Sequence, residues 1–264
     1  MTVMNILEQI IAHKRKEVEQ HREAAGTELL LQSSQLLRPT ISMKTALEQS
    51  GTGIIAEFKR KSPSKGWIHP DARIGEVLPL YEEGGATASS VLTDETFFGG
   101  TLDDLRQARE SVGIPLLRKE FIIDEYQLYQ ARAAGADAVL LIASALPRET
   151  CSRFAALAHR LGLEVVLELH GEEELDYIEN TEADMIGINN RNLTTFATDV
   201  THSFRMIERL PAGKVCISES GISSPDTVRR LRDAGFRGFL LGENFMKHEQ
   251  PGAALSDFIQ QLKS

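Results

Sequence analysis

Short apolar runs alternate with longer amphipathic segments over most of this 264-residue chain. Each apolar run has the length of a buried strand, and each intervening segment is long enough for a crossover helix. This alternation is typical of a parallel sheet built from repeated strand–helix units. The eight predicted strands cover residues 53–58, 87–92, 115–119, 138–142, 164–169, 185–188, 214–218 and 238–241.

Eight consecutive units predict an α/β protein with a closed (β/α)8 barrel, the TIM barrel. Residues 83–86, 134–137 and 234–237 support the repetition, since each places a glycine suited to a left-handed helix cap before a strand. A doubly wound open sheet is the alternative. It is disfavoured because no G-x-G-x-x-G follows the first strand, and because polar residues cluster at many strand ends. We expect one barrel domain over residues 1–264, with residues 1–48 as an N-terminal helical extension.

An amphipathic helix is expected within this extension. Asn5 and Glu8 stand three residues apart and can form a capping box at its start. The helix has two possible places: it could close the bottom of the barrel, or it could lie over the site as a lid. The sequence favours neither place. The apolar face of the helix comprises Leu7, Ile10, Ile11 and Val18.

Composition and charge exclude several classes of partner. The net charge is -9, and a nucleic-acid partner would need a concentrated basic surface that the short run 59–61 cannot supply. Cys151 and Cys216 lie far apart without metal-ligand spacing, which suits reduced thiols. No apolar run approaches membrane-spanning length, and no secretory leader is recognisable. We expect a cytoplasmic protein with no nucleic-acid partner and no membrane partner.

Charged side chains stand at the ends of the predicted strands, beginning with the first. In an extended strand, Glu57 and Lys59 share one face with Ile55, whereas Ala56 and Phe58 share the other. A carboxylate and an ammonium group therefore meet where the strand enters a loop broken by proline and glycine. An isolated pair of this kind is usually a solvated surface ion pair. The recurrence of the pattern downstream favours an active site at the barrel mouth.

The third, fifth and sixth strands repeat this pattern. Lys119 closes the third strand with an inward-facing side chain, Glu168 closes the fifth, and Asn189 and Arg191 follow the sixth. Singly, Lys119 and Glu168 could be surface charges, but together they supply the opposed groups that proton transfer needs. Carboxylates would keep the lysines charged and burial would oppose the charge, and the sequence does not decide between these effects. Glu168 and His170 lack a third metal ligand, so no metal is predicted.

The seventh and eighth strands end in residues suited to a phosphate group. Loops after these two strands commonly hold phosphate in such barrels, together with a short helix N-terminus. Gly221 and Gly242 would let backbone amides approach an anion, and Ser220 can donate its hydroxyl. Glu243 is expected to offer its backbone N–H while its carboxylate points away. The alternative is that all four are ordinary turn residues.

Together these motifs resemble the indole-3-glycerol phosphate synthase family over nearly the whole chain. Residues 55–66, I-A-E-F-K-R-K-S-P-S-K-G, are similar to the family signature, and the family also has an N-terminal helical extension. One departure is Glu120, where many relatives carry aspartate; the longer side chain keeps the charge. Further matching segments, in the family's order, are residues 92–94, 97–100, 118–121, 168, 187–193 and 219–222.

The resemblance implies closure of the indole ring of 1-(2-carboxyphenylamino)-1-deoxyribulose 5-phosphate, with loss of carbon dioxide and water. This lyase step of tryptophan biosynthesis needs no cofactor. Lys119 would be the acid that meets the sugar ketone oxygen, and Glu168 would be the base. Glu57 and Lys59 would support them, with Lys59 an alternative acid for dehydration. Asn189 would hold a substrate hydroxyl or orient Glu168.

The same resemblance implies how the substrate is held. Arg191 suits the anthranilate carboxylate because its guanidinium forms a planar fork. Phe98 and Phe121 would form an apolar slot for the aromatic ring, although either could be plain core. Some relatives are joined to phosphoribosylanthranilate isomerase, so fusion or association with that enzyme is an open alternative. The predicted phosphate clamp consists of Ser62, Ser220, Gly221, Gly242 and Glu243.

Three other functions are alternatives to this one. A phosphosugar isomerase would need no arginine for a carboxylate beside a second acid–base set. An aldolase would use a lysine as a Schiff base, which borohydride would trap. A silent barrel that only binds a phosphorylated ligand, or serves as a partner surface, would have no need for opposed acid and base groups.

Overall fold

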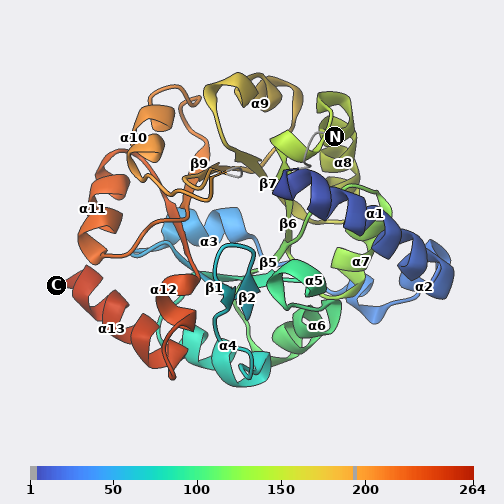
Figure 1. The fold of residues 1–264 in the computed structure, drawn as a ribbon, viewed down its shortest axis with the longest axis horizontal. Helices are drawn as coiled ribbons and strands as arrows, with labels where there is room; N and C mark the ends of the chain where they lie inside the picture. Colours follow the sequence, from blue (N-terminus) through green and yellow to red (C-terminus); the bar gives the residue numbers. More distant parts are fainter. Residues whose placement is uncertain (1–4, 193–194) are drawn as a thin grey trace.

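Eight parallel strands close into a barrel in the computed structural model of the chain, with helices around the outside (Figure 1). The structure describes residues 5–192 and 195–264; Leu193, at the end of one family-like segment, lies outside them. The first barrel strand pairs in parallel with both the second and the last, so the sheet is closed. The barrel strands are β1 (Ile54–Phe58), β4 (Ala88–Leu92), β5 (Leu116–Lys119), β6 (Ala138–Ile142), β7 (Glu164–Leu169), β8 (Met185–Asn189), β9 (Val215–Glu219) and β10 (Gly238–Leu241).

The predicted (β/α)8 barrel is confirmed, and the open doubly wound sheet is excluded. Every predicted strand is present, with each end displaced by at most one residue. The strands predicted from the sequence do not include a two-stranded hairpin that follows β1. It is formed by β2 (Lys61–Ser62) and β3 (Gly66–Trp67). It occupies the loop that the sequence marked as broken by proline and glycine.

Helices follow the barrel strands and pack against their outer surface. They are α4 (Ile74–Glu83), α6 (Leu102–Ser111), α7 (Tyr126–Ala133), α8 (Arg148–Arg160), α9 (Asp176–Asn180), α10 (Thr201–Ile207), α11 (Pro225–Asp233) and α13 (Pro251–Lys263). Short helical turns lie near the strand ends, namely α5 (Glu95–Phe98), η2 (Ala143–Ala145), η3 (Glu172–Glu174) and α12 (Glu243–Met246). The extension before β1 contains α1 (Ile6–Ala24), α2 (Thr27–Leu30), η1 (Ser34–Leu37) and α3 (Met43–Gln49).

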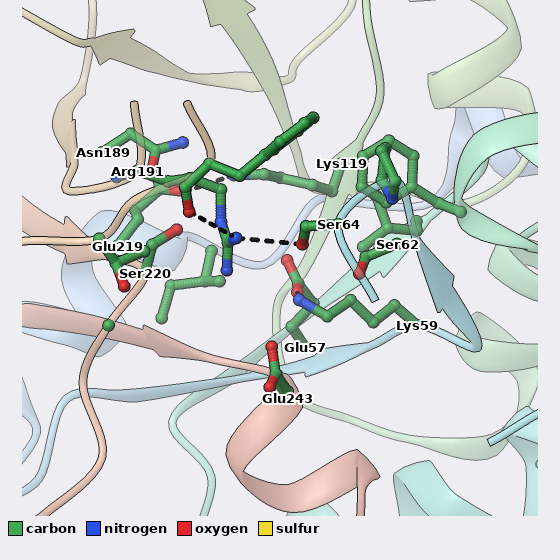
Figure 2. Close-up of a pocket in the computed structure, with 18 of the residues that line it drawn as sticks. Glu57, Lys59, Ser62, Ser64, Lys119, Asn189, Arg191, Glu219, Ser220 and Glu243 are labelled. Carbon is green, nitrogen blue, oxygen red and sulfur yellow. Dashed lines mark hydrogen bonds and ion pairs between the residues drawn. The ribbon is translucent and has the colours of Figure 1, made fainter. Parts of the chain in front are cut away.

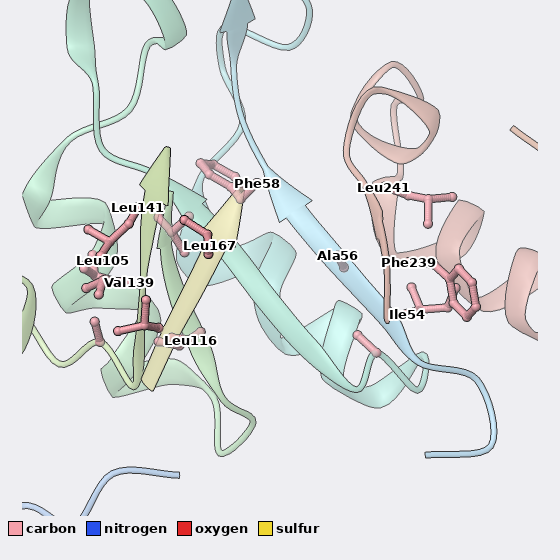
Figure 3. Close-up of a cluster of buried hydrophobic side chains, with 14 of the residues drawn as sticks. Ile54, Ala56, Phe58, Leu105, Leu116, Val139, Leu141, Leu167, Phe239 and Leu241 are labelled. Carbon is pink, nitrogen blue, oxygen red and sulfur yellow. The ribbon is translucent and has the colours of Figure 1, made fainter. Parts of the chain in front are cut away.

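Each barrel strand packs its two faces into different cores. Ala56 and Phe58 belong to the cluster between strands and helices (Figure 3). Ile55, Leu117 and Val166 belong to a second cluster inside the barrel. This period of two is what an extended backbone requires. Residues that lie on the same face as the inner cluster and end their strands therefore point toward the barrel mouth.

The extension closes the barrel at both ends. Helix α3 fills the bottom, where the fully buried Met43 and Leu47 join the inner cluster. Helix α1 lies at the opposite end, and its residues Ile6, Leu7 and Ile10 line the cavity at the mouth. Of the two places weighed for the first helix, the structure therefore favours the lid. Whether extension and barrel form a single domain stays a prediction.

The predicted capping box at the start of α1 is confirmed. The Asn5 side chain accepts a hydrogen bond from the Glu8 backbone at 2.9 Å, and the Glu8 carboxylate accepts one from the Asn5 backbone at the same distance. These bonds satisfy two amide groups that the first helical turn leaves unpaired. Among the described helices, none combines the length and apolar character that crossing a membrane requires.

Candidate active site

A cavity of about 480 Å³ opens at the C-terminal ends of the barrel strands (Figure 2). Its volume lies within the range of small-molecule sites. The structure brings every predicted site residue to its wall: Glu57, Lys59, Ser62, Phe98, Lys119, Phe121, Glu168, Asn189, Arg191, Ser220, Gly221, Gly242 and Glu243.

Lys119 lies at the centre of the charged groups in this cavity. Its Nζ donates a hydrogen bond to Glu168 Oε2 at 2.9 Å and another to Glu219 Oε2. The two carboxylates come from β7 and β9 and are almost fully buried. One ammonium group is thus held between two carboxylates from separate strands. Such contacts give a charged group a fixed position with little freedom to rotate.

These contacts decide the protonation states that the sequence left open. Burial opposes the charge of Lys119, but Glu168, Glu219 and Glu57 outweigh burial and raise the pKa of Lys119 well above its ordinary value. Burial also opposes the charge of Glu168, yet Lys119 and His170 hold the pKa of Glu168 well below its usual range. Burial, together with nearby Glu168, raises the pKa of Glu219 to about 7 despite Lys119. Near neutral pH, Lys119 is an ammonium group and Glu168 a carboxylate.

The acid–base pair of β1 faces the same cavity. Lys59 Nζ lies 2.7 Å from Glu57 Oε1, and both side chains are largely buried. Gly242 allows this arrangement, because a Cβ there would lie only 3.0 Å from Glu57 Cβ and would collide with its carboxylate. The exposed surface ion pair considered as the alternative is therefore excluded.

Two further side chains contact Glu168. Asn189 Nδ2 donates a hydrogen bond to Glu168 Oε1 at 3.2 Å, and His170 Nε2 lies 3.3 Å from the same oxygen. The side-chain Oδ1 of Asn189 accepts a hydrogen bond from the Arg191 backbone N–H at 3.0 Å. Asn189 therefore links the carboxylate of β7 to the loop that carries Arg191.

Arg191 reaches across the cavity mouth to the β2–β3 hairpin. Its Nη1 donates to Ser64 Oγ at 3.1 Å and to the Phe196 carbonyl at 3.3 Å (Figure 2). Phe98 and Phe121 lie on another part of the wall, with ring centroids 5.9 Å apart. Both rings are only partly buried, so they are available to a bound molecule rather than enclosed in the core.

Four of the five residues of the predicted phosphate clamp lie where β9 and β10 end, and the fifth, Ser62, lies in β2. Ser220 and Gly221 both have positive φ, +68° and +74°, an arrangement that is unusual for serine. Gly242 caps the short helix α12, which begins at Glu243. The Glu243 carboxylate faces Lys65 Nζ at 3.8 Å. Left-handed backbone turns beside a helix start are a common way to direct amide groups at an anion.

Several residues of the cavity are absent from the predicted set. Glu219 ends β9 directly before the predicted Ser220. A charged residue at a strand end is the signal that identified Glu168, and the same signal could have identified Glu219. Ser64 and Lys65 lie in the hairpin loop, where the sequence gives no strand pattern to follow. Lys247 also lines the cavity, just after α12. Among the described residues, no group of three His, Cys, Asp or Glu is arranged to hold a metal ion.

Acid and base groups gathered at the C-terminal face of a (β/α)8 barrel place this chain among the barrel enzymes. The sequence model of the indole-3-glycerol phosphate synthase family matches residues 7–258. The chain belongs to this family. A relative of that name from Bacteroides thetaiotaomicron is 58% identical over 98% of this chain and 99% of its own length. Another, from Neisseria gonorrhoeae, is 45% identical over 94% and 97%.

Solved structures with a similar barrel are much more distant in sequence. A mutant tryptophan synthase alpha-subunit from Pyrococcus furiosus superposes with a TM-score of 0.61 at 15% identity, covering 80% of this chain and 98% of that one. A thiamine phosphate pyrophosphorylase from the same organism has a TM-score of 0.58 at 17% identity, covering 84% and 98%. At these identities the likeness supports the fold alone.

Proposed function

We propose that this chain closes the indole ring of 1-(2-carboxyphenylamino)-1-deoxyribulose 5-phosphate and releases indole-3-glycerol phosphate, carbon dioxide and water. The observation that carries the proposal is the contact of Lys119 with Glu168 and Glu219 inside the cavity. An ammonium group fixed between carboxyl groups can donate a proton to a substrate oxygen and then be reprotonated by a neighbouring carboxyl group.

The first step forms a carbon–carbon bond. The ring carbon that bears the carboxylate attacks the carbon of the sugar ketone, and negative charge develops on the ketone oxygen. Lys119 is the proposed acid at this oxygen, and its raised pKa supports the role because the group stays protonated. Loss of carbon dioxide then returns the bonding electrons to the ring.

The second step removes water. One group must protonate the departing hydroxyl and another must accept a proton from the intermediate. Glu168 is the proposed base, because its lowered pKa keeps it ionised near neutral pH and able to accept a proton. Asn189 is proposed to orient it through the 3.2 Å hydrogen bond. Lys59, paired with Glu57, is the alternative acid for this departure.

Three regions of the wall are proposed to hold the substrate. Arg191 would take the anthranilate carboxylate, exchanging its bond to Ser64 for a bidentate contact. Phe98 and Phe121 would face the aromatic ring. The phosphate would lie at the opposite end, where Lys65 and Lys247 add positive charge to the loops after β9 and β10. The proposed clamp residues are Ser62, Ser220, Gly221, Gly242 and Glu243.

An aldolase that uses a Schiff base is the nearest alternative reaction. It needs a neutral lysine amine as nucleophile. Burial among carboxylates favours the ammonium form of Lys119, which argues against that role. Treatment with borohydride and a carbonyl substrate is therefore expected to leave Lys119 unmodified. A stable adduct on Lys119 or Lys59 would contradict the non-covalent mechanism.

The direct test is the appearance of indole fluorescence when purified protein is mixed with the synthetic substrate. We expect turnover by the natural chain and a loss of about 10²–10⁴-fold in kcat for Lys119→Ala. Lys44→Ala is the matched control, since this lysine lies on α3 at the bottom of the barrel. Turnover by Lys119→Ala near the natural rate would refute the assignment.

We also expect the reaction to take place in the cytoplasm. Two buried free thiols, Cys151 and Cys216, suit a reducing compartment. Fusion or association with phosphoribosylanthranilate isomerase stays a prediction, which copurification of the two activities would test.

A further inference from the structure

Lys14 is a fully buried lysine that the reaction described above does not use. It lies on α1, and its side chain has no exposed surface. A buried ammonium group is costly unless it is paired. Its Nζ lies 2.8 Å from Asp94 Oδ2, 3.1 Å from Glu120 Oε1 and 2.8 Å from Glu17 Oε1. Two of these partners belong to the barrel, so one side chain fastens the lid helix to the strand ends of β4 and β5.

The first partner controls the turn that carries Phe98. Asp94 caps α5, since its Oδ1 accepts a hydrogen bond from the Phe97 backbone at 2.7 Å. Its other oxygen, Oδ2, is buried and makes an ion pair with the Lys14 ammonium group at 2.8 Å. Removal of Lys14 would therefore leave a buried carboxylate oxygen without compensation, at the start of the turn that ends in Phe98.

The second partner controls the position of Phe121. Glu120 Oε1 accepts a hydrogen bond from the Phe121 backbone at 2.8 Å and also faces Lys14. Glu120 Oε2 accepts from Thr93 Oγ1 at 2.7 Å. Burial opposes the charge of Glu120, but Lys14 and Arg118 outweigh burial and lower its pKa. Glu120 thus joins Lys14 to the backbone of Phe121.

Lys14 also holds in place the helix that lies beside Phe98 and Phe121. Ile6, Leu7 and Ile10, on the same helix, line the cavity that Phe98 and Phe121 border. The Lys14 ammonium group thus connects α1 to the residues that precede both aromatic rings. The phosphate loops, after β9 and β10, make none of these contacts.

We propose that Lys14 is a positioning residue for the aromatic half of the substrate, acting through Asp94 and Glu120 on Phe98 and Phe121. The inference rests on the proposed function, because the slot is assigned to the anthranilate ring. It predicts that loss of Lys14 affects the binding of the two ends of the substrate differently. Loss of Lys14 disturbs the slot and the lid, while the phosphate end keeps its affinity.

The test compares Lys14→Met with the natural chain. We expect KM for the synthetic substrate to rise at least about tenfold, because the slot loses its alignment. The inhibition constant of inorganic phosphate, a probe of the opposite end, should change less than about twofold. Arg22→Met is the control, since Arg22 is on the same helix but makes an exposed ion pair with Asp124. Its KM should stay unchanged.

A second variant keeps the test decisive if Lys14→Met fails to fold. Lys14→Met/Asp94→Asn removes the ammonium group together with the Asp94 carboxylate that faces it, while Glu120 keeps its ion pair with Arg118. Its stability should therefore recover while the lid stays detached and KM stays raised. An unchanged KM in either folded variant would overturn the inference, as would equal weakening of substrate and phosphate. Absence of turnover by the natural chain would instead count against the proposed function.

Discussion

Gly187 shows how a single missing side chain allows the charged cluster to form. A Cβ at this position of β8 would lie 2.5 Å from Glu219 Oε1 and 3.3 Å from Val166 Cγ1. The backbone of Gly187 is not in the left-handed region, so alanine is conformationally allowed there. The contact with the carboxylate is the main obstacle to a larger residue.

We expect Gly187→Ala to impair catalysis more than stability. The methyl group would push Glu219 away from Lys119, and kcat should fall by about tenfold or more. The free energy of unfolding should change by no more than about 1 kcal/mol, because the displaced atom ends a flexible side chain. Gly75→Ala is the control, since a Cβ at Gly75 meets no atom within 4 Å. Normal turnover by Gly187→Ala would contradict the role of the Glu219–Lys119 contact.

Glu219 makes the stability of the protein depend on pH. Its pKa is raised to about 7 in the folded state, from an ordinary value of 4.5. The folded protein therefore binds this proton more tightly than the unfolded chain does. Ionisation favours the unfolded chain, so the contribution of Glu219 to folding becomes less favourable as the pH rises from about 4.5 through about 7.

The matching prediction concerns Glu219→Gln, which cannot ionise. The melting temperature of the natural chain should fall relative to that of this variant as the pH rises from about 5 to about 8. Calorimetry at several pH values would measure the difference. A difference that stays constant over this range would show that the Glu219 carboxyl has an ordinary pKa in the folded protein.

At the scale of elements, helices α1 and α3 of the extension have different roles. Helix α1 covers the mouth, and α3 fills the bottom of the barrel. Leu47 of α3 is fully buried and lies where a Cβ at Gly238 would come within 3.3 Å of it. Gly238 is the first residue of β10, whereas the charged cluster lies at the C-terminal strand ends, so α3 is expected to support stability rather than chemistry.

Leu47→Ala should therefore lower the free energy of unfolding by about 2–5 kcal/mol while the folded fraction keeps its kcat. Denaturant titration and the indole assay, below the melting transition, would measure the two effects. Leu37→Ala is the control, because Leu37 is 88% exposed and its loss should have little effect. A loss of kcat in folded Leu47→Ala would show that the barrel bottom affects the site.

For the whole molecule, the extension and barrel share buried contacts at both ends. Met43 and Leu47 lie in the inner cluster, and Lys14 pairs with barrel carboxylates. We expect one cooperative unfolding transition in which the calorimetric and van't Hoff enthalpies agree. Two resolved transitions would contradict the prediction of a single domain over residues 1–264.

Much of the fold follows from the sequence, because strand periodicity is local. The alternation along the first strand predicted that Ile55 lies on one face and Ala56 and Phe58 on the other, and the two clusters confirm this division. Parallel closure then brings all C-terminal strand ends to one face, so strand-end residues such as Lys119 and Glu168 could be assigned to one cavity. Their roles in catalysis stay predictions.

Other features depended on the tertiary structure. Lys119 and Glu219 are 100 residues apart, and only the folded barrel brings the two side chains into contact. The same is true of Lys14 and its barrel carboxylates, and of the position of α1 at the mouth. A repeating pattern encodes which way a side chain points, since that depends on neighbouring residues. Which distant charge it meets, and therefore its pKa, depends on distances that exist only after the strands have closed.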